Sequence, residues 1–419
     1  MVLSKLLSQT VSQNAIANAI RTVLQVIIGF FGSFILIRSV SSVEFGAWAL
    51  NLTLASFLGL VDFGIATAII KYTASETKNI NKIFWTAMFY YGTVGLLAGT
   101  IIVSIQYWLK DTLYHGYSPS LLFIATAVVG TYISWLAANF NNILNGLQIM
   151  KRTSALEVIK SALFYLCIIP LIPKFHLYAF PLGFMLSNIL GFVLSYYLIK
   201  GKADLSFHKF DIEIFKKLIT YGLKSYGMHL TALFKMSFIK IVTSQIFNLQ
   251  YVAYVEMSQK IGSYIRQMYS SINSPLLPAA SFWHASGDKT KIKKLFWYSQ
   301  SIFTGLGILG TIAFIPLAPF LITSWLGSSY TAVIPIAILE CISIFGNMLL
   351  GPIFTIYQGM GRFKPILTTF ALTVILMLIL LPLLGNVIGF HGLYYGFIVA
   401  EFVPMLIFFT WFLKRKMPF

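Results

Sequence analysis

Residues 366–386 read ILTTFALTVILMLILLPLLGN, a run of 21 residues that carries no charge. An α-helix needs about 20 residues to cross the hydrocarbon core of a bilayer, so this stretch is long enough to span one. The composition extends that conclusion, because 58% of the 419 residues are hydrophobic and only 10% are charged. Soluble domains carry about 25% charged residues. The sequence therefore predicts an integral membrane protein and excludes an ordinary soluble enzyme.

Twelve apolar stretches of spanning length follow one another and predict an all-α membrane protein. The longest polar connection, 200–218, divides them into an N-terminal six-helix bundle at 1–199 and a C-terminal six-helix bundle at 219–419. Six is an even number, so the two bundles share one topology, as in transporters whose central cavity lies between two repeats. The spans are expected near 14–37, 45–71, 83–109, 120–149, 154–172, 176–199, 219–246, 251–281, 295–322, 333–358, 366–386 and 390–413.

The net charge of +18 would suggest a nucleic-acid partner in a soluble protein. Here the basic residues are concentrated in alternate connections between the spans. With the N-terminus inside, 20 of them lie in inner connections and three in outer ones. Membrane proteins retain such residues on the cytoplasmic side. The pattern predicts a multi-pass protein with both termini in the cytoplasm, and it gives no reason to expect nucleic acid.

Seven basic residues lie within the predicted spans. Lys160 and Lys240 are near interfaces, where a lysine can extend its ammonium group to water. A cation deeper in the bilayer is costly and normally faces a watery cavity or a partner. We predict a cationic, substrate-binding cavity formed by Arg21, Lys224, Lys235, Lys260 and Arg266.

Span one also places polar side chains at offsets of 0, 4, 7 and 11 residues, which fall on one face of a helix. The inner end of span four repeats the offsets 0, 4 and 7. For span four, hydrogen bonding between helices explains the pattern as well as a cavity lining does. The predicted polar lining comprises Asn14, Asn18, Gln25 and Asn145.

Two acids in the spans are candidates for gating or coupling. Asp62 is expected at the same depth as Arg21, which predicts an ion pair that helps to close the inner side; a static structural pair is the alternative. Glu256 is expected to pair with Lys235 or Lys260, or else to carry a coupling proton or sodium ion. We expect no cofactor, and no metal-ligand spacing is present in the sequence.

Short motifs occur in a fixed order along the chain. SVEFGAW at 42–48 and LVDFGIATA at 60–68 resemble the opening of Wzx-type polysaccharide-repeat flippases, which belong to the multidrug/oligosaccharidyl-lipid/polysaccharide exporter superfamily. NGLQ at 145–148, WLGSSY at 325–330 and YQGMGR at 357–362 resemble later segments of the same family. The resemblance runs the full length of the chain.

The resemblance implies two six-helix bundles, with spans one, two, seven and eight lining the cavity. It also implies a flippase, not an enzyme, that moves undecaprenyl-diphosphate-linked oligosaccharide from the cytoplasmic to the periplasmic leaflet of a bacterial inner membrane. That activity serves the biosynthesis of O-antigen, a part of lipopolysaccharide, or of capsule. Membrane lipids, a polysaccharide polymerase and chain-length proteins would be its partners. Arginine and lysine suit an anionic diphosphate.

Other functions remain open on the sequence. A lipid II-type flippase or a multidrug exporter of the same superfamily is the alternative, although the chain lacks an acid in span one and the two extra helices expected of a lipid II flippase. A membrane-embedded polysaccharide polymerase or acyltransferase is an alternative of a different class. Such an enzyme requires a large outer loop or a clustered His/Asp or His/Arg set, and the sequence contains neither.

Overall fold

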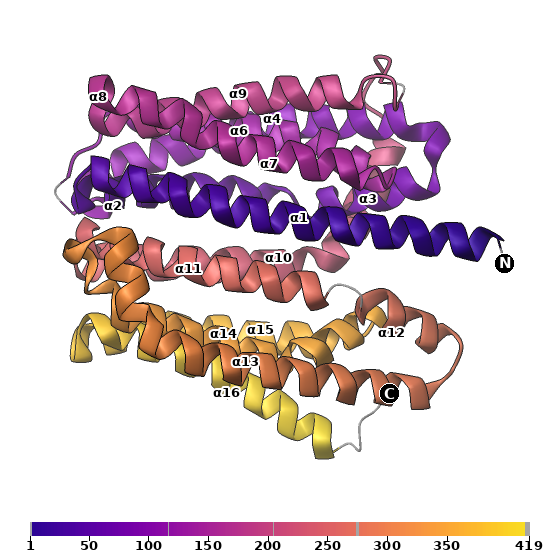
Figure 1. Cartoon of the computed structure of the whole chain (residues 1–419). Helices are drawn as coiled ribbons and strands as arrows, with labels where there is room; N and C mark the ends of the chain where they lie inside the picture. The colour runs from indigo at the N-terminus through magenta and orange to yellow at the C-terminus, as the bar shows by residue number, and fades with distance from the viewer. Residues whose placement is uncertain (1, 116, 204, 274–275, 415–419) are drawn as a thin grey trace. The chain divides into compact units, whose positions relative to one another are not determined.

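The computed structural model describes residues 2–115, 117–203, 205–273 and 276–414. Every regular element in that part of the chain is a helix, and the described residues contain no strand (Figure 1). This confirms the all-α class predicted from the sequence. The side chain of Asn14 lies outside the described residues.

The chain divides into two compact units, Met1–Leu233 and Phe234–Phe419, and the division falls inside α10 (Ile212–Ile246). The bundle boundaries drawn from the sequence stay a prediction. The other helices of unit 1 are α1 (Val2–Ser39), α2 (Ser42–Ala55), α3 (Ile65–Ser75), α4 (Ile80–Trp108), α5 (Lys110–Leu113), α6 (Leu121–Gly146), α7 (Met150–Ile168), α8 (Ile172–Phe175) and α9 (Ala179–Ile199). Those of unit 2 are α11 (Leu249–Asn273), α12 (Leu276–Ala285), α13 (Lys289–Leu326), α14 (Val333–Gly359), α15 (Lys364–Ile388) and α16 (Phe390–Lys414).

Nine segments within the described residues are long and apolar enough to cross a membrane. One of them, 151–199, is 49 residues long and covers α7 from its second residue together with the whole of α9. Helices α10 and α11, which carry most of the deep basic residues, are not among the nine. The multi-pass helical architecture is therefore established, whereas the count of twelve spans stays a prediction.

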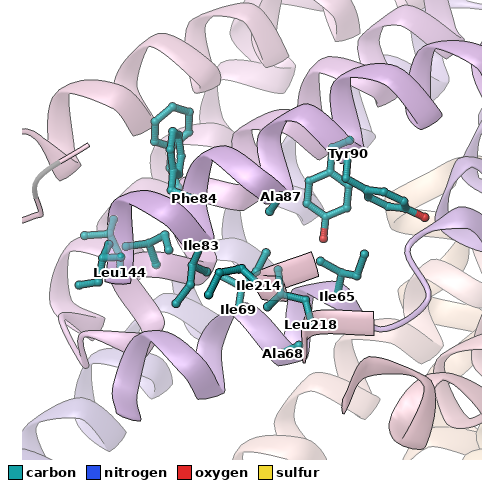
Figure 2. Packing of buried hydrophobic residues seen from close by; sticks show 14 of the residues in the cluster. Ile65, Ala68, Ile69, Ile83, Phe84, Ala87, Tyr90, Leu144, Ile214 and Leu218 are labelled. Carbon is teal, nitrogen blue, oxygen red and sulfur yellow. The ribbon is translucent and has the colours of Figure 1, made fainter. Parts of the chain in front are cut away.

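The core of unit 1 forms where α3, α4, α6 and the first turns of α10 meet (Figure 2). Ile65 and Ile69 lie one turn apart on α3 and are fully buried with Phe84 of α4 and Leu218 of α10. Lipid tails are as apolar as these side chains, so the exclusion of water contributes little to their association. Close van der Waals packing is what stabilises this part of the unit.

The predicted second span is interrupted near its middle. After α2 the chain continues as a 3-10 segment at Ser56–Val61, and α3 begins only after Phe63 and Gly64. These two residues adopt φ angles of 47° and 75°, in the left-handed region that favours glycine. The sequence pattern did not predict this interruption.

The interruption frees backbone carbonyl groups, and tyrosines bind them. The Tyr90 hydroxyl donates to the Val61 carbonyl at 2.6 Å, and the Tyr226 hydroxyl donates to the Leu60 carbonyl. Irregular backbone at membrane depth is tolerated only where its polar groups are satisfied within the protein. The tyrosines therefore hold the interrupted helix in place.

Gly64 allows a test of this arrangement. A Cβ atom at Gly64 would overlap the backbone of Gly222, which lies in the same unit, whereas a Cβ at Gly201 would meet nothing within 4 Å. Both glycines have φ near 75°, at 75° and 74°. Gly201→Ala should cost about 1–2 kcal/mol for the left-handed conformation alone. Gly64→Ala should cost more because the overlap is added. Thermal unfolding of the purified variants measures both, and equal losses would contradict the close packing.

Unit 2 is organised around α14, which packs against α11, α12, α13 and α16. Gly262 brings α11 close to α14, because a Cβ atom there would lie 2.9 Å from the Glu340 side chain. This close approach places polar groups of α11 and α14 against one another in the interior of the unit.

Candidate functional site: two polar regions, one in each unit

The polar stripe of span one faces α7. The Ser154 hydroxyl donates to Asn18 Oδ1 at 3.2 Å, and Gln25 Nε2 donates to the Ser161 hydroxyl at 3.1 Å. Farther along, the Tyr165 hydroxyl donates to the Gly29 carbonyl at 3.3 Å. In this structure Asn18 and Gln25 hold two parallel helices together. Their role as a cavity lining stays a prediction.

Arg21 belongs to the same stripe of α1 and borders a groove of about 640 Å³ between α1 and α7. Lys151 and Ser154 of α7 line the same groove. The Nε atom of Arg21 is buried and has no hydrogen-bond partner among the described residues. A buried donor of this kind is costly unless a partner binds it.

Asn145 lies in the last turn of α6, where its backbone carbonyl accepts a hydrogen bond from the Gln148 amide at 3.0 Å. The amide of Asn141, one turn earlier, donates to Glu157 Oε1 at 2.8 Å. This bond joins α6 to α7. Hydrogen bonding between helices thus accounts for Asn141, and the lining role of Asn145 is not decided by these contacts.

Asp62 does not form the predicted pair with Arg21; this expectation is wrong for the described residues. Its carboxylate accepts the Tyr91 hydroxyl at 2.8 Å and the Gly64 amide at 3.0 Å. It therefore caps the start of α3 at the interruption of span two. Asp62 also borders a cavity of about 300 Å³, together with His229 of α10.

In unit 2, Lys235 lies against a carboxylate that was not predicted from the sequence. Lys235 of α10 forms an ion pair with Glu401 of α16, whose side chain is only 3% exposed. Asn347 Nδ2 donates to Glu401 Oε2 at 3.0 Å, and the Ser343 hydroxyl donates to the same oxygen. Three groups from two other helices thus surround this carboxylate.

Arg266 also forms an ion pair with a buried glutamate of unit 2. One guanidinium nitrogen lies 2.6 Å from Glu340 Oε1, and the other donates to the Gln259 carbonyl at 3.2 Å. The Glu340 side chain is 2% exposed, whereas that of Arg266 is 30% exposed. The carboxylate therefore lies behind the cation, and the guanidinium is the group that remains accessible.

The partner of Glu256 differs from the expected one. Glu256 forms its ion pair with Lys240, at 2.5 Å between Oε2 and Nζ, so pairing with Lys235 is wrong. Lys260 lies one turn farther along α11 and interacts electrostatically with Glu256. Lys224 is exposed and belongs to the half of α10 in unit 1. The five predicted cations are thus distributed over both units.

Glu340 and Glu401 could have been found in the sequence. Each is the only charged residue in its predicted span, 333–358 or 390–413. An isolated acid within a membrane span is a functional candidate by default. Neither span contains a lysine or an arginine, so no ion pair was predicted there.

These features define a multi-pass helical membrane protein with buried ion pairs, the class to which transporters belong. The family model described as "Polysaccharide biosynthesis protein" matches residues 11–284, which is more than half of the chain. The chain belongs to this family, and the family predicted from the motifs is confirmed. No curated protein gives a significant match.

Solved structures share the fold. An inward-facing multidrug resistance MATE family transporter of the MOP superfamily aligns with a TM-score of 0.71 and 16% identity, over 96% of this chain and 98% of that one. The lipid II flippase MurJ in an inward closed conformation aligns with a TM-score of 0.76 and 16% identity, over 96% and 87%. A MOP superfamily transporter from Pyrococcus furiosus aligns with a TM-score of 0.63 and 16% identity, over 96% and 95%. At these identities the likeness establishes the fold alone.

Proposed function

We propose that the protein is a flippase for undecaprenyl-diphosphate-linked oligosaccharide repeat units. It moves them from the cytoplasmic to the periplasmic leaflet of a bacterial inner membrane, by alternating access, for O-antigen or capsular polysaccharide. The observation that carries the proposal is Arg266, an accessible cation fixed on a buried glutamate inside a membrane protein of a polysaccharide-biosynthesis family. Both termini lie in the cytoplasm, and no cofactor takes part.

The chemistry of the substrate supports this role for the cations. A sugar repeat cannot cross the hydrocarbon core unaided, and its diphosphate carries negative charge that must be stabilised on the way. A guanidinium binds phosphate oxygens through two parallel hydrogen bonds. Arg266 is held by Glu340 with part of its surface exposed, so its geometry is fixed before the substrate arrives. Lys260 on α11 carries further positive charge in unit 2, and Arg21 and Lys224 carry positive charge in unit 1.

A lipid II-type flippase is the second candidate, because the MurJ structure aligns with a TM-score of 0.76. A multidrug exporter is less compatible with an accessible arginine, since many exported drugs are cations and a fixed positive charge repels them. Both flippase proposals require a diphosphate-binding cation. The two flippases differ in the saccharide that they move, so a transport assay with each substrate distinguishes them. Coupling to a proton or sodium gradient stays a proposal, with Glu256 as its candidate residue.

The test is a flipping assay with purified protein in proteoliposomes, using a fluorescent undecaprenyl-diphosphate oligosaccharide and, in parallel, lipid II. Arg266→Ala should reduce the flipping rate at least tenfold, and Arg266→Lys should restore only part of it because an ammonium cannot make the forked contact. Lys174→Ala, in the short helix α8 and outside both polar regions, is the control and should flip at the wild-type rate.

Arg266→Ala leaves Glu340 buried and unpaired, so a folding defect must be separated from a loss of function. The double variant Arg266→Met with Glu340→Leu removes both charges together and should fold. If this variant folds and flips the oligosaccharide at the wild-type rate, Arg266 does not bind the diphosphate. If only lipid II is flipped by the wild-type protein, the second candidate replaces the first.

A further inference from the structure

The groove between α1 and α7 has a charged end and an apolar remainder. On α1 it is lined at positions i, i+3, i+4 and i+7, which form one helix face. Arg21 and Lys151 supply two positive charges, and no acidic residue is among the lining residues. The complete lining is Ala17, Ile20, Arg21, Leu24, Lys151, Ser154, Ala155, Val158 and Ile159.

The nearest carboxylate on α7 does not neutralise these cations. Glu157 accepts the Asn141 amide at 2.8 Å and lies 3.8 Å from Lys160. Its side chain is thereby committed to α6 and to its own helix. The buried Nε of Arg21 has no hydrogen-bond partner among the described residues, so the groove retains an unsatisfied cationic donor.

The apolar part of the groove is exposed, as a lipid-binding wall must be. Ile20 is 55% exposed, Leu24 40% and Ile159 43%. Beyond these residues α1 and α7 are in direct contact. The Tyr165 ring packs against Gly32, and its hydroxyl donates to the Gly29 carbonyl. The groove therefore has one cationic end and one end closed by an aromatic ring.

We propose that this groove binds the polyprenyl diphosphate carrier of the substrate. Arg21 and Lys151 contact the diphosphate, and the first isoprene units lie along Leu24, Val158 and Ile159. This inference rests on the proposed function, and it assigns to unit 1 a binding site for the lipid carrier of the substrate.

The number of charges favours this occupant over an ordinary phospholipid. A diphosphate diester carries two negative charges, which match the two cations of a groove without a lining carboxylate. A phosphodiester headgroup carries one and would leave one cation uncompensated, at a cost because Arg21 is partly buried. The branched side chains of the wall provide apolar contact for the isoprene units.

Binding can be measured without transport, by native mass spectrometry of the full-length protein in detergent. The probes are undecaprenyl diphosphate without sugar, phosphatidylglycerol, and inorganic diphosphate. Arg21→Gln combined with Lys151→Gln should weaken binding of undecaprenyl diphosphate at least tenfold. Leu24→Trp, which fills the apolar part, should weaken it to a similar degree while inorganic diphosphate binds as before. Lys364→Gln is the matched control, since Lys364 borders a second groove, of about 320 Å³, between α15 and α16.

Each outcome decides the proposal. Unchanged binding of undecaprenyl diphosphate in the double variant would overturn it, as would wild-type binding of phosphatidylglycerol with equal affinity. Loss in the double variant and in Leu24→Trp, with Lys364→Gln unaffected, would support it. If undecaprenyl diphosphate binds as expected but no oligosaccharide is flipped, the groove assignment holds and the proposed function fails. If flipping occurs and the groove variants bind undecaprenyl diphosphate normally, the proposed function holds and the groove assignment fails.

Discussion

Replacing Glu340 with alanine is expected to lower the free energy of unfolding by about 3–5 kcal/mol, the usual cost of removing one partner from a buried ion pair. Glu340 is 2% exposed and lies 2.6 Å from the guanidinium of Arg266. Its removal leaves Arg266 partly buried without its counter-charge. It also opens a space beside Gly262, against which the glutamate packs. Thermal unfolding of the purified protein, followed by circular dichroism, measures the loss.

The double variant Arg266→Met with Glu340→Leu is the matched control for this effect. Apolar side chains of similar volume often replace a buried ion pair without loss of stability. We therefore expect the double variant to unfold near the wild-type temperature while flipping is lost. Wild-type stability in Glu340→Ala would show that the pair contributes nothing to the fold. Wild-type flipping in the stable double variant would show that it contributes nothing to function.

Much of the architecture could be predicted because the bilayer restricts the backbone so strongly. Every polar backbone group within the hydrocarbon region must be satisfied internally, so a long uncharged run such as 366–386 has to become a helix. The structure contains this helix as α15 (Lys364–Ile388). The interruption at Phe63 and Gly64 could not be predicted in this way, because tyrosines from other helices satisfy the carbonyl groups that it frees.

The partners of the charged residues were less predictable, for a geometric reason. A rise of 1.5 Å per residue gives the depth of a side chain but not the direction in which its helix faces. Asp62 and Arg21 were expected at one depth, yet Asp62 binds Tyr91 and the start of α3. Glu256 was expected near Lys235 and pairs instead with Lys240, on the same helix as Lys235.

The polar stripe of span one shows the same limit. Asn18 and Gln25 lie on one helix face, as the spacing predicts, but spacing cannot distinguish a face that lines a cavity from one that binds another helix. Ser154 and Ser161 occupy complementary positions on α7 and decide in favour of helix pairing in this structure. Arg21 differs from its neighbours because its side chain borders the groove.

Exchanging the charges of Lys235 and Glu401 is expected to rescue the fold much less than the same exchange at Lys240 and Glu256. Lys235→Glu alone would place two buried carboxylates beside each other. Glu401→Lys alone would place two buried ammonium groups beside each other. Each single variant should lose about 3–5 kcal/mol of stability. The exchanged double variant restores opposite charges, but it places an ammonium where the Asn347 amide and the Ser343 hydroxyl now donate hydrogen bonds.

An ammonium group has no acceptor. The Ser343 hydroxyl can rotate to accept from it, but the Asn347 amide, whose Nδ2 also donates to the Ser343 carbonyl at 3.1 Å, would face it as a donor. Each unsatisfied buried donor costs about 1–3 kcal/mol. The exchange at residues 235 and 401 should therefore recover less than half of the loss. At residues 240 and 256 the carboxylate is 26% exposed, so water can satisfy the exchanged groups and most of the stability should return. A double-mutant cycle on each pair gives the two coupling energies. Equal recovery at both pairs would show that Asn347 and Ser343 do not specify a carboxylate at position 401.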